Sequence, residues 1–90
     1  MAAKEKEFER VLKALANRRR LAVISYLKNK KEASVGEIAE HIKLSIKATS
    51  KHVALLAAAG VLEKEQNSRF MIVCLVDPIP EIVRHIVKML

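Results

Sequence analysis

The 90-residue sequence predicts one mainly helical domain with a small β-hairpin, in the order α-α-α-α-β-β-α over residues 1–90. Three observations carry this prediction. Apolar residues recur at helical spacing through most of the chain, and β-branched runs replace that pattern after Gly60. Cap sequences at Ser34 and Ser45 divide the middle of the chain into two short helices.

Residues 4–16 and the segment after Asn17 are predicted to form the first two helices. The apolar face of the first helix comprises Phe8, Val11, Leu12 and Leu15. Asn17 can cap the second helix, where Leu21, Ile24 and Leu27 share a face. The charged segment 28–32 is predicted to be a loop.

The middle of the chain has explicit start and stop signals. Ser34 and Glu37 have the S-x-x-E spacing of a capping box, which starts a short helix. Residues 43–44 form the turn, Ser45 caps the next helix, and Gly60 suits the position that ends it. This gives two short helices joined by a tight turn.

A hairpin and a last helix complete the predicted order. Residues 61–66 and 69–76 are short apolar and β-branched runs joined by a turn at Asn67 and Ser68. Residues 77–80 break the second strand, and the final amphipathic helix follows, with an apolar face of Ile82, Val83, Ile86, Val87 and Leu90. Two short helices followed by a hairpin are the pattern of a winged helix-turn-helix.

The charge is positive and unevenly distributed. Lys and Arg number 17 against 10 Asp and Glu, a formal charge of +7, and residues 17–33 alone carry +5. A clustered positive field attracts nucleic acid or an acidic membrane surface. The lone Cys74 excludes an internal disulfide and any site with several thiolates. Neither a signal peptide nor a membrane span is recognised, so we expect a cytoplasmic protein without membrane partners.

A helical wheel divides residues 45–59 into an inner and an outer arc. Thr49, His52, Val53, Leu55 and Leu56 fall on the arc expected to face the core, with Ala48 and Ala59. The outer arc holds small residues, one isoleucine and two lysines: Ile46, Lys47, Ser50, Lys51, Ala54, Ala57 and Ala58. Small side chains admit a backbone to the major groove, where Lys, Ser and Ile can contact phosphates and base edges.

The chain contains the segment LKALANRRRLAVISYL, followed by VGEIAEHIKLSIKATSKHVALLAAAGVLEKEQNSRFMIVCL. With these segments it resembles the ArsR (arsenic-repressor-like) winged helix-turn-helix regulators from about residue 8 to 76. The resemblance implies a homodimeric DNA-binding protein, usually a repressor, with recognition helix 45–59 within the helix-turn-helix 34–59 and a wing at 61–76. It implies dimerisation through segments 1–16 and 78–90, and a pseudo-palindromic duplex as the partner. The predicted dimer surface comprises Phe8, Val11, Leu12, Leu15, Ile79, Ile82, Val83, Ile86, Val87 and Leu90; the alternative for these residues is the core of the chain itself.

The predicted DNA contacts fall on three regions, and the wheel and the resemblance agree on Ile46, Lys47, Ser50 and Lys51 as the positions that contact bases. The recognition helix contributes Ser45, Ile46, Lys47, Thr49, Ser50, Lys51 and His52; the wing contributes Lys64, Asn67, Ser68 and Arg69; the basic half contributes Arg18, Arg19 and Lys31. His52 is interpreted as a packing or phosphate-edge residue rather than a base contact. Arg20 is either a structural residue paired with an acid such as Glu37 or a DNA contact.

The chain departs from the family in its metal-site positions and its wing. Ser34 and Gly36 occupy the positions of the family's C-x-C pair, so no thiolate metal site and no cofactor are expected. Asp77, Glu81 and His85 are ligand-type residues near another family site, but their spacing does not match it; Glu81 and His85 are more simply a surface pair. In the wing, acidic residues stand at positions 63 and 65, which predicts weak DNA contact concentrated at Arg69. Cys74 is expected to be a buried, inert thiol.

Three other functions were weighed from the residues. No nucleophile–base pair or phosphate-binding glycine loop supports an enzyme. The lysines do not flank large apolar residues as they do in a membrane-surface helix. A winged-helix protein–protein interaction module is the main alternative, because the wing is partly acidic. The effector, if one exists, is not indicated by the sequence.

Overall fold

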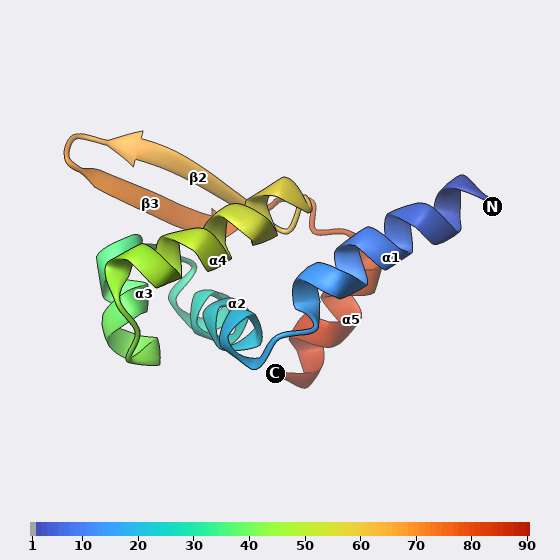
Figure 1. Ribbon diagram of the computed structural model, residues 1–90, viewed down its shortest axis with the longest axis horizontal. Helices are drawn as coiled ribbons and strands as arrows, with labels where there is room; N and C mark the ends of the chain where they lie inside the picture. The colour runs from blue at the N-terminus through green and yellow to red at the C-terminus, as the bar shows by residue number, and fades with distance from the viewer. Residues whose placement is uncertain (1) are drawn as a thin grey trace.

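The computed structural model describes residues 2–90, which form five helices and a three-stranded sheet. The order is α1 (Ala3–Leu15), α2 (Arg18–Lys30), β1 (Glu32–Ser34), α3 (Val35–Ile42), α4 (Ile46–Ala58), β2 (Leu62–Asn67), β3 (Phe70–Leu75) and α5 (Glu81–Met89). The hairpin β2–β3 extends from one end of the molecule, and α1 and α5 lie at the other (Figure 1). The predicted order of helices and hairpin is confirmed.

The core is built around α2. Side chains from every layer are fully buried against it, namely Val23 and Ile24 of α2, Ile38 of α3, Leu56 of α4, Val73 of β3 and Val83 of α5. Burying each large aliphatic side chain contributes about 1.5–3 kcal/mol. This shared core holds the two middle helices and the hairpin in one arrangement.

The segment that was expected to be a charged loop is largely structured. Helix α2 continues to Lys30, and Glu32–Ser34 forms the short strand β1. β1 pairs antiparallel with β3, with Ala33 opposite Val73, so the sheet order is β1-β3-β2. The strand was missed because its charged first residue hides the alternation: only Ala33 of the three is buried.

The hairpin turn lies one residue later than predicted. Asn67 still pairs with Phe70, so the turn is made by Ser68 and Arg69 rather than by Asn67 and Ser68. Ser68 has a φ of 58°, a left-handed conformation, and its carbonyl accepts a 3.0 Å hydrogen bond from Nε2 of Gln66. Gly60 has a φ of 79°, which fits its predicted place after α4.

In the described part of the chain, residues 2–90, no helix is long and apolar enough to cross a membrane.

Candidate nucleic-acid interface

Local hydrogen bonds define where α3 and α4 begin. Oγ of Ser34 accepts from the Glu37 amide at 3.1 Å, and the Glu37 carboxylate accepts from the Ser34 amide at 3.0 Å. These two bonds to Ser34 lower the pKa of Glu37. Oγ of Ser45 accepts from the Ala48 amide at 3.1 Å. Both predicted caps are present, so the first turn of each helix is fixed by its own sequence.

The turn between the two helices is tight. Lys43 has a φ of 57°, in the left-handed region, and the Leu44 amide donates to the Ala39 carbonyl at 3.0 Å. Thr49, Val53 and Leu56 then hold α4 against the core. The opposite face of α4 is thereby turned outward.

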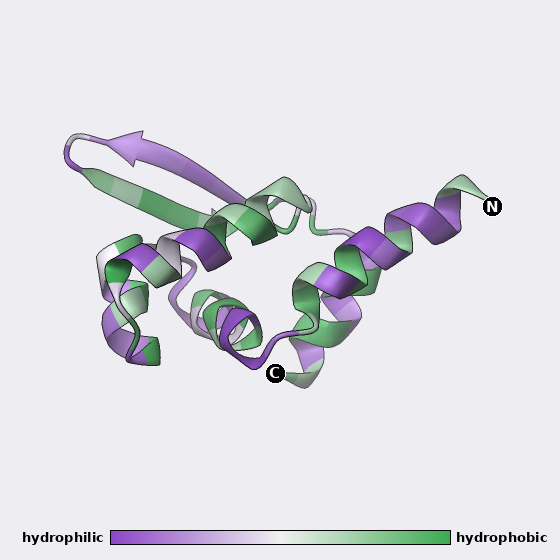
Figure 2. Ribbon diagram, viewed as in Figure 1, coloured by the Kyte–Doolittle hydropathy of each residue, from purple (hydrophilic) through white to green (hydrophobic). Residues whose placement is uncertain are grey.

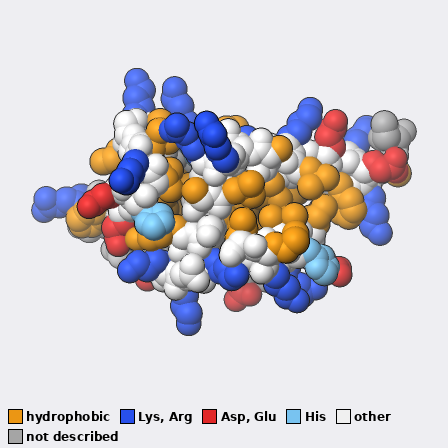
Figure 3. Space-filling view, turned by 90° about the horizontal axis from the view of Figure 1, so that it is seen from below, with side chains coloured by type: hydrophobic (Ala, Val, Ile, Leu, Met, Phe, Trp, Pro, Cys, Tyr) orange, Lys and Arg blue, Asp and Glu red, His pale blue; other side chains and the backbone are white. Residues whose placement is uncertain are grey.

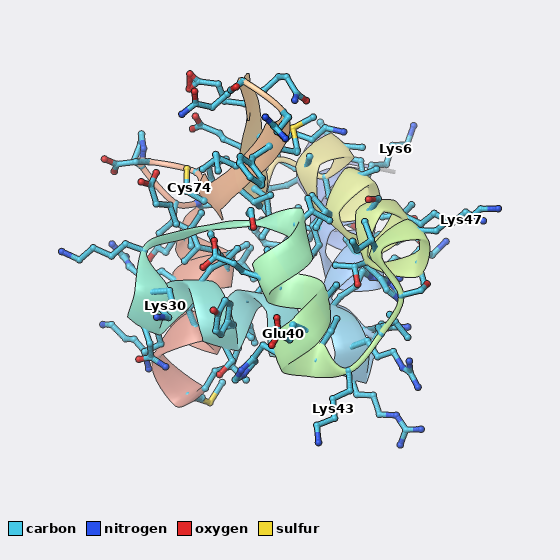
Figure 4. All side chains as sticks on the ribbon, turned by 90° about the vertical axis from the view of Figure 1, so that its left-hand side faces the viewer. Lys6, Lys30, Glu40, Lys43, Lys47 and Cys74 are labelled. Atoms are coloured by element: carbon cyan, nitrogen blue, oxygen red, sulfur yellow. The ribbon has the colours of Figure 1, made fainter. Side chains whose placement is uncertain are left out.

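That outward face carries the residues singled out by the wheel. Ile46 is 62% exposed, and Lys47, Ser50, Lys51 and Ala54 are also exposed. Figure 4 shows Lys47 extending away from α4 into solvent, on the opposite side of the molecule from Cys74. The face contains no acidic residue. A thin, cationic helix face of this kind can approach a polyanion closely.

Two expectations for α4 are wrong, and a third is corrected. Thr49, expected among the DNA contacts, is 0% exposed and cannot reach DNA from this position. Leu55, expected to face the core, is 53% exposed, because α1 covers that flank of α4 incompletely and leaves a hollow of about 400 Å³ lined by Leu55 and Arg10. Ala57, placed on the outer arc, is half-buried and packs against the core.

The wing has two strands of opposite character. Figure 2 shows β2 as hydrophilic and β3 as largely hydrophobic. Glu63, Lys64 and Glu65 are all exposed on β2, as is Arg69 in the turn. Lys64 and Arg69 are thus the only cations of the wing. Glu63 and Glu65 precede and follow Lys64 in β2, so their side chains project from the opposite face of the strand.

A groove of about 690 Å³ connects the wing with α4. Ile46 and Ser50 line it from α4, and Lys64 and Arg69 line it from the wing. Glu37 and Glu40 of α3 also line it. Two candidate residues of α4 and two of the wing therefore share one groove, and α3 adds two carboxylates to its wall.

The expected contacts in the basic half lie around the ends of α2. Arg18 and Arg19 are exposed in its first turn, where Oδ1 of Asn17 accepts from the Arg19 and Arg20 amides. Lys31 is exposed at its other end, with a φ of 72°. Arg18 and Arg19 lie at the end of α2 opposite Lys31, so these cations do not form one cluster.

Arg20 has a structural role, but its expected partner Glu37 is wrong. Its Nε donates to the Ala14 carbonyl at 2.6 Å, and its Nη2 donates to the Lys13 carbonyl at 3.3 Å. Its Nη1 lies 3.4 Å from Nδ1 of His52. Sequence reasoning missed these contacts because they join α1, α2 and α4, and no local spacing signals them.

His52 is half-buried at the edge of α4. Burial lowers the pKa of His52 below its usual range, and the nearby charges of Arg20 and Arg19 lower it further. The imidazole is therefore neutral at physiological pH.

The ligand-type residues near α5 do not converge. Nε2 of His85 lies 3.9 Å from Oε1 of Glu81, and both side chains are exposed, as expected of a surface pair. Within residues 2–90, no three His, Cys, Asp or Glu side chains are placed to hold a metal ion together. Cys74 is half-buried rather than buried; partial burial raises the pKa of its thiol, and the charges of Glu63, Glu32 and Glu65 raise it further.

The end of the molecule opposite the wing exposes apolar side chains. Phe8 and Leu12 of α1 are 42% and 45% exposed. Leu90, at the C-terminus, is also exposed. Figure 3 shows hydrophobic side chains gathered over this end. Of the predicted dimer surface, Ile79, Ile82, Ile86 and Val87 are half-buried, whereas Val11, Leu15 and Val83 lie in the core of the chain.

Comparisons with known proteins agree with this architecture. Residues 15–65 match the family model described as a helix-turn-helix domain. The transcriptional activator HlyU of Vibrio cholerae serotype O1 is 37% identical over 59 residues, which are 66% of this chain and 54% of that protein. The match thus spans about half the length of this curated relative.

Solved structures extend the similarity over nearly the whole chain. HlyU from Vibrio cholerae N16961 superposes with a TM-score of 0.84 at 28% identity, covering 99% of this chain and 92% of that one. A homodimeric winged helix-turn-helix DNA-binding domain, Mb0332 of Mycobacterium bovis, described as a possible ArsR-family regulator, gives a TM-score of 0.84 at 24% identity, covering 97% and 78%. The second likeness shows the fold. The chain therefore belongs to the helix-turn-helix domain family, and its fold is that of a winged helix-turn-helix domain.

Proposed function

We propose that this protein is an ArsR-like transcriptional regulator that binds double-stranded DNA sequence-specifically as a cytoplasmic homodimer, with α4 in the major groove. The observation that carries the proposal is the outer face of α4, which exposes small residues, Ile46 and two lysines but no acid. Lys47 and Lys51 are one helical turn apart, and their mutual repulsion costs a few tenths of a kcal/mol in an isolated helix. A polyanion on this face would offset that repulsion.

The exposed residues of α4 divide into two kinds of contact. Lys47 and Lys51 can bind phosphates or the O6 and N7 atoms of guanine, and Ser50 can bond a base edge. Ile46 can contact the methyl group of thymine. Ser45 is at the N-terminus of α4, where an exposed helix end favours a phosphate.

The wing and the ends of α2 are proposed to contact the DNA backbone. Lys64, Asn67, Ser68 and Arg69 line or flank the wing tip, and Arg18, Arg19 and Lys31 add positive charge near α2. Because carboxylates flank Lys64, we expect most of the wing contribution to come from Arg69. The helix-turn-helix is thus assigned to residues 34–59 and the wing to residues 61–76.

The segments 1–16 and 78–90 are proposed to form the dimer interface. Phe8, Leu12 and Leu90 expose apolar surface that the chain itself does not cover. The half-buried Ile79, Ile82, Ile86 and Val87 extend this surface along α5. HlyU is named an activator, whereas the family resemblance implies repression; we propose repression, because a dimer seated on its operator blocks other proteins from that DNA.

Selection of bound duplexes from a random DNA pool tests the proposal. A dimer should enrich a pseudo-palindrome with half-sites about 10–10.5 bp apart, one turn of the double helix. Parallel selections with and without divalent metal ions show whether metal changes the result. Recovery of unrelated sequences without symmetry would contradict sequence-specific binding.

A protein–protein interaction module is the second candidate, because Glu63 and Glu65 are exposed on the wing. Salt dependence separates the two functions. Each neutralised phosphate lowers log K by about 0.9 per unit of log salt concentration. Association that needs no duplex and hardly responds to salt would favour the protein-binding function.

A further inference from the structure

We propose that Arg20 is a positioning residue for DNA recognition: it holds His52 of α4 with its proton on Nε2, and this N–H donates to a DNA phosphate. The inference rests on the proposed DNA binding and adds Arg20, which acts on DNA through His52. Arg20 itself does not need to touch DNA.

The guanidinium of Arg20 is fixed before it reaches α4. Arg20 lies in the first turn of α2, where its own amide donates to Oδ1 of Asn17 at 3.1 Å. Its side chain donates to the carbonyls of Ala14 and Lys13, at 2.6 and 3.3 Å. These carbonyls are among the last four of α1, which have no partner within the helix. The guanidinium therefore caps the C-terminal end of α1 with Nε and Nη2, and its Nη1 remains available for another contact.

The remaining nitrogen determines the tautomer of His52. Nη1 of Arg20 lies 3.4 Å from Nδ1 of His52. A guanidinium donates only, so Nδ1 must accept and cannot carry a proton. A neutral imidazole then carries its proton on Nε2. The contact thus selects one of the two neutral forms.

The Nε2–H group of His52 is left free for a ligand. Among the described residues, Nε2 of His52 has no hydrogen-bond partner. If this atom were buried it would be a buried polar atom without a partner, but in this part of the chain Oγ1 of Thr49 is the one such side-chain atom. Nε2 therefore reaches solvent. His52 directly follows Lys51 in α4, at the edge of the proposed DNA face. A neutral N–H donor at this position suits a phosphate oxygen, because hydrogen bonds to charged acceptors are the strong ones.

Nitrogen-15 NMR of the ring in the free protein tests the tautomer without DNA. At pH 7.5 we expect wild-type His52 to carry its proton on Nε2. Arg20→Met, which removes the donors, should give a mixture of the two tautomers. Arg10→Ala is the matched control: Nη1 of Arg10 also joins α1 to α4, by a 3.0 Å bond to the Ala58 carbonyl, but it does not touch His52. Arg10→Ala should leave the tautomer unchanged. A proton on Nδ1 in the wild-type protein would overturn the inference, even if Arg20→Met does not fold.

Two substitutions of His52 test the phosphate contact. The amide of His52→Asn replaces Nδ1 and keeps an acceptor for Arg20, whereas the amide of His52→Gln replaces Nε2 and keeps the outer donor. We expect His52→Asn to weaken operator binding by about tenfold, the value of one charge-assisted hydrogen bond, and His52→Gln to weaken it by about threefold or less.

These outcomes separate the inference from the proposed function. If the wild-type protein binds its operator and His52→Asn binds equally well, the phosphate contact is wrong and the proposed function stands. If the wild-type protein binds no duplex, both are wrong. Loss of binding in His52→Asn with an unchanged melting temperature supports the inference.

Discussion

The two ends of the molecule expose different kinds of surface. The outer face of α4 presents lysines among small side chains, whereas α1 and the C-terminal residues present Phe8, Leu12 and Leu90. Both surfaces remain uncovered by the chain itself. Exposed cations on a face without acidic residues suit a hydrated polyanion, even with Ile46 exposed beside them, and a group of exposed large apolar side chains suits a protein surface. The difference supports the proposal that DNA binds at one end and a second subunit at the other.

The largest effect is expected at the α4 end. Lys47→Ala with Lys51→Ala should weaken operator binding by about 100-fold, since each lysine contributes contacts worth about 1–3 kcal/mol at a base edge. Both side chains are exposed, so the melting temperature should not fall. Fluorescence anisotropy with the selected duplex measures the change, and Lys28→Ala, at an exposed lysine of α2 that the proposal places in neither surface, is the control. Unchanged affinity for the operator would contradict the proposal that α4 contacts DNA.

A charge on the apolar end should separate the subunits. Leu12→Glu places a carboxylate on a side chain that is 45% exposed in the single chain, so the fold should tolerate it. We expect a monomer by sedimentation at micromolar concentration, and operator binding about tenfold or more weaker, because two linked half-sites bind more tightly than one. Lys28→Glu, which places a carboxylate at an exposed position outside both segments, is the control and should remain a dimer. A wild-type monomer would contradict the assignment of this end.

In the wing, removing negative charge should strengthen DNA binding. Glu63→Gln with Glu65→Gln removes two carboxylates from the strand that carries Lys64, and operator affinity should rise by about two- to tenfold, because these exposed charges repel DNA phosphates. The gain should shrink as salt is raised. If the affinity falls instead, the wing carboxylates take part in recognition.

The smallest effect is expected on the inner side of α4. Oγ1 of Thr49 is buried without a hydrogen-bond partner. Thr49→Val replaces this hydroxyl with a methyl group and should raise the free energy of unfolding by about 1 kcal/mol, the cost of an unsatisfied buried polar group. Thr49→Ser keeps the hydroxyl, opens a cavity and should lower it. Urea denaturation measures both, and operator affinity should not change in either variant.

Local signals predicted most of the fold. The caps at Ser34 and Ser45 and the glycine after α4 work within a few residues, so the sequence alone shows them. Strand β1 needs β3 as a partner, and the exposure of Leu55 depends on how α1 packs, so neither is visible in a helical wheel. The link from Arg20 to His52 spans 32 positions. Contacts between distant elements are what sequence reasoning lacked.

The candidate DNA-binding residues were also predictable where local periodicity determines their position and not where packing between elements does. The periodicity of α4 identified Lys47, Ser50 and Lys51 as outward residues, because a helix held by its core face must turn its other face out. The same wheel placed Thr49 on the core arc, and its full burial agrees with that placement and contradicts the DNA contact that was also expected of it. The large apolar residues of α1 and α5 divided between core and surface in a way that a shared apolar stripe does not reveal.

Cross-linking from position 50 tests the central claim most directly. A thiol-coupled photo-cross-linker on Ser50→Cys, in a Cys74→Ser background, would sit in the middle of the outer face of α4. We expect it to attach to bases inside both half-sites of the selected duplex, while the same reagent on Lys28→Cys, in α2, attaches to none. Cross-links from position 28 but none from position 50, in a complex that still forms, would contradict the placement of α4 in the major groove.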